Sequence, residues 1–209
     1  ALNFVDKPEA RKIHLKNIPL LGGLSVATGF VLLCIYDVLI TPGRYLDKPM
    51  LGYLAGSIII VLIGIIDDHK GMKPAVKLAG QIAVSLLFIG TNFTVGELGL
   101  MFGSIYLSLP IMLLWMVGLM NALNFLDNMD GIISGMAGIL GLGFFAFALV
   151  NTTQANQEAM ALMALIALSF AGSTFGFLPY NFNPARIFLG DAGSMFIGYF
   201  LSSMGILMA

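Results

Sequence analysis

The sequence predicts an all-α protein, a polytopic bundle of transmembrane helices. Of its 209 residues, 58% are hydrophobic and only 10% are charged, and the mean hydropathy is +0.94. A soluble domain carries roughly a quarter charged residues. The long apolar runs do not alternate with polar residues, as the strands of a membrane barrel would. We therefore expect an integral membrane protein, and the net charge of −1 gives no indication of a nucleic-acid partner.

Seven apolar windows are long enough to cross roughly 30 Å of hydrocarbon. They lie at about residues 20–40, 50–66, 75–90, 105–125, 132–150, 159–178 and 193–209. The window at 75–90 is the weakest, because Lys77 and Gln81 fall in its first turns. The 25 glycines suit close helix packing in lipid, where no hydrophobic drive holds helices together. We expect about seven spans.

The distribution of lysine and arginine orients these spans. Eight of the ten basic residues lie in the loops of one side, namely Lys7, Arg11, Lys12, Lys16, Lys70, Lys73, Lys77 and Arg186. The other side has only Arg44 and Lys48. Cytoplasmic loops carry the excess of basic residues. The first group of loops is therefore expected to be cytoplasmic.

Acidic residues fall at the ends of three spans on that same side. They are Asp67 and Asp68 in IIDDHKG, Asp127 and Asp130 in NFLDNMDG, and Asp191 in FLGDAGS. We expect these five carboxylates to share one face and one depth. Charges at the membrane boundary are costly unless they are paired, hydrated or metal-bound, so such residues indicate function.

Two kinds of cation could compensate these carboxylates. Lys70, Lys73, Lys77 and Arg186 could form ordinary structural ion pairs with them. We favour a divalent ion, because Mg²⁺ takes one or two protein oxygens and fills its remaining positions with water and substrate phosphates. The sequence thus predicts a Mg²⁺ site, with Mn²⁺ as an alternative.

The stretch NALNFLDNMDGI at 121–132 combines amides with carboxylates. If the preceding helix continues through it, Asn124, Asp127 and Asp130 recur every three residues on one side, and Asn121 extends the row by a turn. Alternatively the helix ends there and Gly131 closes it. The helix dipole disfavours acids at a C-terminus, so a positive partner is expected in either case.

Three motifs in this order, IIDDHKG, NALNFLDNMDG and NFNPARIFLGDAGS, resemble those of the polyprenyl-phosphate N-acetylhexosamine-1-phosphate transferases, glycosyltransferase family 4. The segment VDKPEARKIHLKNIPLLGG at 5–23 is similar to that of the bacterial undecaprenyl-phosphate GlcNAc-1-phosphate branch. The resemblance covers essentially the whole chain. Three separate motifs make it specific, whereas a pair of aspartates alone would be weak.

The resemblance implies a function. The family transfers a sugar-1-phosphate, here most simply GlcNAc-1-phosphate, from a UDP-N-acetylhexosamine to a polyprenyl phosphate and releases UMP. It implies a Mg²⁺-dependent enzyme of the bacterial inner membrane, with several spans and a cytoplasmic active site. The reaction would be the first membrane step of cell-envelope polysaccharide synthesis. A homodimer is left open.

The resemblance also implies roles for individual residues. Asn124 and Asp191 match positions that hold Mg²⁺ against the diphosphate. Phe188 matches an aromatic residue that stacks on uracil, and Asp130 matches a uridine contact. Lys77 matches a lysine that reaches the phosphates.

The remaining candidates are catalytic or bind substrate. Asp67 and Asp68 match a pair of which one deprotonates or orients the lipid phosphate, and Asp127 is catalytic without an assigned step. Asn121 and Arg186 are candidates for substrate binding, although Arg186 could simply mark the cytoplasmic side. We favour direct attack by the lipid phosphate, and a route through an aspartyl phosphate stays open.

The chain departs from the family pattern at both ends. Family members have a helix before the VDKP segment and a late His-x-His-His loop followed by further spans. We therefore expect residues 1–209 to form a single membrane domain that lacks the family's first helix and C-terminal spans. A catalytically incomplete fragment or scaffold is the main alternative. An intramembrane aspartyl protease is disfavoured, because Phe188 stands where its Gly-x-Gly-Asp motif needs glycine.

Overall fold

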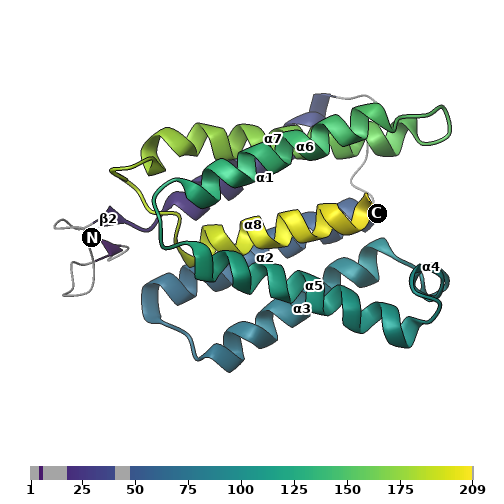
Figure 1. Ribbon diagram of the computed structural model, residues 1–209, viewed down its shortest axis with the longest axis horizontal. Coiled ribbons are helices and arrows are strands. Elements are labelled where there is room, and N and C mark those ends of the chain that lie inside the picture. Colours follow the sequence, from purple (N-terminus) through teal and green to yellow (C-terminus); the bar gives the residue numbers. More distant parts are fainter. Residues whose placement is uncertain (1–4, 7–17, 41–47, 209) are drawn as a thin grey trace.

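The computed structural model describes residues 5–6, 18–40 and 48–208, and it confirms an all-α fold (Figure 1). The elements are β1 (Val5–Asp6), β2 (Ile18–Pro19), α1 (Gly22–Ile40), α2 (Lys48–Lys70), α3 (Pro74–Asn92), α4 (Val95–Met101), α5 (Ile105–Leu126), α6 (Ile132–Val150), α7 (Gln157–Asn181) and α8 (Gly190–Leu207). The two short strands pair antiparallel. Five of the basic residues that were used to orient the spans, at positions 7, 11, 12, 16 and 44, lie outside the described residues.

One long helix overlaps each of the seven predicted windows. Five of these helices, α2, α3, α5, α6 and α7, are long and apolar enough to cross a membrane, and Gly22–Tyr36 of α1 forms a shorter apolar helix. The protein is therefore a multi-pass membrane protein, and the number of spans stays a prediction. The sequence analysis did not predict α4 or the strand pair. Helix α4 begins at a capping box, in which Thr94 and Glu97 satisfy each other's backbone amides.

Helix α8 occupies the centre of the bundle. In Figure 1, α1, α6 and α7 lie on one side of it and α3 and α5 on the other, with α2 alongside. Fifteen of its 18 residues are buried. Polar side chains are among them, and the hydroxyls of Ser194, Ser202 and Ser203 donate to carbonyls of the same helix. The helix is therefore surrounded mainly by protein.

Backbones approach one another closely around α8. A Cβ on Gly64 of α2 would lie 2.2 Å from Ala192 Cα, and one on Gly198 would lie 2.5 Å from Met120 Cα. Larger residues at Gly64 or Gly198 would force the helices apart. Small residues at such contacts let membrane helices gain dispersion energy from direct backbone packing.

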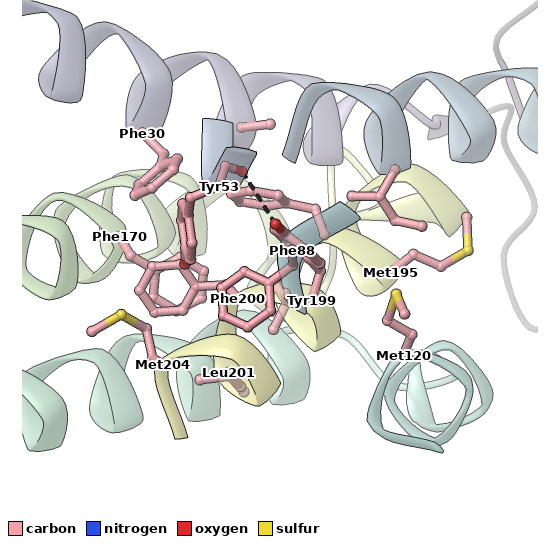
Figure 2. Packing of buried hydrophobic residues seen from close by; sticks show 14 of the residues in the cluster. Phe30, Tyr53, Phe88, Met120, Phe170, Met195, Tyr199, Phe200, Leu201 and Met204 are labelled. Atoms are coloured by element: carbon pink, nitrogen blue, oxygen red, sulfur yellow. Dashed lines mark hydrogen bonds between the residues drawn. The ribbon is translucent and has the colours of Figure 1, made fainter. Parts of the chain in front are cut away.

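An aromatic cluster fixes the depth of α8 in the bundle (Figure 2). The Phe170 and Phe200 rings stack with centroids 3.5 Å apart, and Phe30 packs edge-on against Phe200. The Tyr199 hydroxyl donates to the Tyr53 carbonyl at 3.2 Å. Helices α1, α2 and α7 thus contact the same segment of α8, and its first turn is positioned accordingly.

Three helix junctions meet at the end of the bundle where β2 lies (Figure 1). Helix α2 is followed by Gly71, with φ +68°, and α3 starts at Pro74, which suits the first helical position. A turn joins α5 to α6, and α8 begins at Gly190, with φ +73°. These junctions carry the acidic motifs.

Candidate active site

The Lys77 ammonium group is the centre of a polar cluster built from four helices. Its Nζ lies 2.8 Å from Asp67 Oδ2 of α2, 3.0 Å from Asn124 Oδ1 of α5 and 3.0 Å from Asp191 Oδ2 of α8. The Lys77 and Asp67 side chains are only 14% and 11% exposed, whereas Asp191 is 33% exposed. The cluster is therefore shielded on the α2–α3 side and accessible at Asp191.

Each of the three side chains that contact Lys77 is oriented by a second hydrogen bond through another of its atoms. The Met72 amide donates to Asp67 Oδ1 at 2.6 Å. The Asn124 amide group donates to Asp191 Oδ1 and to Ser194 Oγ. Asn124 Oδ1 therefore points at the lysine, because its amide nitrogen is engaged by α8. The ion-pair alternative is thus realised in part, by Lys77 with two of the acids.

Asp68 has partners other than Lys77, although it follows Asp67 directly. Its two carboxylate oxygens accept hydrogen bonds from the backbone amides of Asp191 and Ala192, at 2.9 and 3.2 Å. These amides belong to the first turn of α8, which leaves such donors unsatisfied and favours negative charge. Asp68 therefore fastens the end of α2 to the start of α8.

Asp127 follows α5 and lies between these groups. Burial, together with the neighbouring carboxylates of Asp191 and Asp68, raises the pKa of Asp127 to about 7. A hydrogen bond from the Gly190 amide opposes this rise. Near neutral pH the Asp127 carboxyl group can therefore either hold or release a proton.

Of the two alternatives for the amide and carboxylate motif, the continuous helical row is wrong, and the helix ends within the motif as the other alternative expects. Helix α5 ends at Leu126, and residues 127–131 form a turn that leads to Gly131, with φ +73°. Only Asn121 and Asn124 share a helix. Glycine adopts this left-handed backbone conformation without strain, so the chain reverses here into α6.

Asp130 lies in that turn and contacts the loop between α7 and α8. Its Oδ2 accepts from Asn183 Nδ2 at 3.1 Å and from the Ala185 amide at 3.0 Å. Nearby, Asn181 accepts from the Gly131 amide and donates to the Ile187 carbonyl. The α5–α6 turn and the α7–α8 loop are therefore tied together, and a uridine contact by Asp130 stays a prediction.

Asn121 lies one turn before Asn124 and pairs with a residue that the sequence analysis did not assign to the site. The amides of Asn121 and Gln81 exchange hydrogen bonds, and Gln81 is fully buried. Gln81 lies one turn after Lys77 on α3. The sequence offered a signal for Gln81, because an amide four residues after a candidate lysine projects from the same face of the helix. Ser194 was missed as well.

A known protein family matches most of the chain. The family model described as glycosyl transferase family 4 matches residues 50–209. The chain belongs to glycosyl transferase family 4. The resemblance inferred from the three motifs is confirmed.

Several curated relatives of this family member are named as transferases. A probable undecaprenyl-phosphate N-acetylglucosaminyl 1-phosphate transferase of Bacillus subtilis is 34% identical, over 99% of this chain and 56% of its own length. A decaprenyl-phosphate N-acetylglucosaminephosphotransferase of Mycobacterium leprae is 32% identical, over 97% of this chain and 54% of its own length. An undecaprenyl-phosphate alpha-N-acetylglucosaminyl 1-phosphate transferase of Thermotoga maritima is 29% identical, over 97% and 56%. The chain spans about half the length of these relatives.

Phe188 and Arg186 of this glycosyl transferase family 4 member lie on the α7–α8 loop, beside the strand pair. The Phe188 amide donates to the Pro19 carbonyl, and the Phe188 carbonyl accepts from the Gly22 amide. Arg186 is exposed, and its amide donates to the Tyr180 carbonyl. Backbone contacts thus fix the loop, while the proposed roles of these two side chains stay predictions.

The residues of the cluster fit a hard divalent ion. In the described part of the chain, no three His, Cys, Asp or Glu side chains are grouped as metal ligands. However, Asn124 Oδ1 and Asp191 Oδ2 converge on one cation, the Lys77 ammonium group. Carboxylate and amide oxygens suit Mg²⁺, which needs only one or two of them when phosphates supply others. Mg²⁺ binding by this pair stays a prediction.

Proposed function

We propose that this protein transfers GlcNAc-1-phosphate from UDP-GlcNAc to undecaprenyl phosphate and releases UMP, in a Mg²⁺-dependent reaction. The names of the relatives support the polyprenyl acceptor and the sugar. The orientation inferred from the basic residues supports an active site at the cytoplasmic face, and the bacterial relatives support a bacterial inner membrane.

One observation carries the proposal. Oxygens from α2, α5 and α8 converge on a single cationic group, Lys77 Nζ, at 2.8 to 3.0 Å. Phosphoryl transfer depends mainly on positioning and charge neutralisation, with little covalent work for the protein. A preorganised cluster of cation and oxygen ligands at a helix junction suits this requirement.

Asn124 and Asp191 are the residues that would hold the metal. Mg²⁺ bound there would neutralise charge on the diphosphate of the UDP-sugar. Lys77 would bind the phosphate oxygens from the α3 side, because its stem is flexible and its head is a compact charge. Asp68 and Ser194 would hold Asp191 and Asn124 in place through the contacts described above.

The acceptor phosphate needs orientation more than deprotonation. A phosphate monoester has a second pKa near 6 and is mostly dianionic at neutral pH. One of its oxygens would attack the phosphorus that carries the sugar, and the bond from that phosphorus to the UMP oxygen would break. UMP leaves with the electron pair of that bond. Asp67 or Asp127 could take the residual proton.

Incubation with radiolabelled UDP-GlcNAc, undecaprenyl phosphate and Mg²⁺ tests this function. We expect label in the extracted lipid and an equal amount of UMP. Asp191→Asn should reduce the rate about 10³-fold, as expected for loss of a central electrostatic group. Ser202→Ala, three turns along α8 and with a hydroxyl that donates to the Tyr199 carbonyl of the same helix, should keep the rate.

Other outcomes would point to the alternatives. Folded wild-type protein that neither labels the lipid nor binds the UDP-sugar would act as a scaffold. Cleavage of a helical membrane substrate would indicate a protease. Wild-type turnover by Asp191→Asn would place the chemistry elsewhere.

A further inference from the structure

The oxygens that suit a metal ion in this protein already bind a cation of the chain itself. The Lys77 ammonium group has three N–H donors. They face Asp67 Oδ2, Asn124 Oδ1 and Asp191 Oδ2 at 2.8, 3.0 and 3.0 Å. All three donors are thus used, and two of the acceptors are the candidate metal ligands.

A divalent ion and this ammonium group cannot share those two oxygens without strong repulsion. An ion bound to Asp191 Oδ2 at about 2.1 Å would lie within about 5 Å of Nζ, since Nζ is 3.0 Å from that same oxygen. Like charges at that separation repel strongly at a partly shielded site. This upper limit on the distance between the ion and Nζ holds from whichever side the ion approaches.

We propose that Lys77 and the metal ion are alternative occupants of the Asn124–Asp191 oxygen pair, so that metal binding moves the Lys77 ammonium group away from it. This inference rests on the proposed function for its metal. It assigns Lys77 a further role, in which the lysine sets the affinity of the site for divalent ions.

The surroundings of Lys77 provide a place for the displaced group. Asp67 is not one of the two candidate metal ligands, and its Oδ2 lies 2.8 Å from Lys77 Nζ. The lysine stem has four methylenes and can change rotamer while that ion pair persists. The displaced ammonium group would then contact Asp67 and any phosphate present. Metal binding and phosphate binding would therefore each favour the other.

A titration with Mn²⁺, followed by the electron paramagnetic resonance signal of the free ion, tests the exclusion. Lys77→Met removes the competing charge, and we expect it to bind Mn²⁺ at least about tenfold more tightly than the wild type. Lys73→Met is the matched control, because Lys73 is exposed and lies one turn earlier at the start of the same helix. Its effect should stay within about threefold, since solvent screens an exposed charge. Asp191→Asn should abolish the tight binding in the Lys77→Met background.

A second measurement uses the wild-type protein and does not depend on the folding of a variant. A small amine-acylating reagent, read by mass spectrometry, reports how accessible each lysine is. Saturating Mn²⁺ should raise the labelling of Lys77 severalfold relative to Lys73. An unchanged ratio would overturn the proposed movement.

The two proposals fail differently. Equal Mn²⁺ affinities in wild type and Lys77→Met, when the wild type forms the lipid product, would overturn the exclusion and leave the proposed function standing. Tighter Mn²⁺ binding by Lys77→Met, when the wild type forms no lipid product, would support the exclusion and overturn the proposed function.

Discussion

The two halves of α8 are held in different ways. Its first turn, residues 190–194, is held by polar contacts. Asp68 accepts hydrogen bonds from two of its backbone amides, and Asn124 donates to the side chains of Asp191 and Ser194. The segment 196–204 is held by aromatic rings and by hydroxyls that bond within the buried core (Figure 2). One half supplies candidate chemistry and the other supplies packing.

This difference indicates how the protein combines a fixed depth with a polar site. Aromatic rings bury large areas and fix orientation by their geometry. Polar contacts in a shielded site are strong only when every group has a partner. The aromatic packing of residues 196–204 therefore fixes the position of the first turn of α8. The polar side chains around that turn can then be oriented toward ligands.

The largest effect should come from removing an aromatic ring. Phe200→Ala deletes the ring that stacks on Phe170, and we expect a loss of about 3–5 kcal/mol in unfolding free energy. Denaturant unfolding in detergent micelles measures it. Leu114→Ala, on a side chain that is 75% exposed, is the control and should change little. The folded fraction of Phe200→Ala should keep its Mn²⁺ affinity, and a change there would show that the halves are not independent.

A smaller effect should come from the amide pair of Gln81 and Asn121, which lies between the polar site and the aromatic core. Gln81→Leu keeps the volume but removes the amide pair with Asn121, which spaces α3 from α5. We expect about a tenfold lower transfer rate, because Lys77 and Asn124 lie one turn away on these helices. The stability cost should be about 1 kcal/mol. Ser85→Ala, one turn further along α3, should leave the rate unchanged, and an unaffected rate in Gln81→Leu would remove this residue from the positioning layer.

A further effect concerns the dependence of stability on pH. The pKa of Asp127 is about 7 in the folded protein, against an ordinary value of 3.8. The folded state therefore keeps this proton to higher pH than the unfolded state does, and stability is lost as pH rises from 4 to 7. Asp127→Asn removes this contribution. In buffer with a chelator, the melting temperature should fall less between pH 5 and 8 in Asp127→Asn than in the wild type, and parallel curves would contradict the assignment.

Much of the fold could be predicted from the sequence, because each long apolar window had to become a helix in lipid. The window 132–150 coincides with α6, and 105–125 differs from α5 by one residue. The central position of α8 could not be predicted, since hydropathy does not say which neighbours surround a helix. Helix α4 is short and depends on the local capping box of Thr94, which was readable but not used.

The gathering of acids at one end was also predictable, from the loops that carry the basic residues. The different surroundings of Asp67 and Asp68 were not. Neighbouring residues on a helix point about 100° apart, and only the packed structure shows which one faces the start of α8. The turn at Asp127 could not be decided from the sequence, because a spacing of three fits a helix as well as a reversal before glycine.

The contact between Asp68 and the first turn of α8 has a consequence for phosphate recognition. Many nucleotide-binding proteins bind phosphate at the start of a helix, where free amides and the positive end of the dipole face the anion. Here a carboxylate of the protein takes the amides of Asp191 and Ala192. Under the proposed function, a substrate phosphate at this end would therefore be bound by side chains and a metal ion. Both can be exchanged or released between turnovers, unlike a fixed backbone cradle.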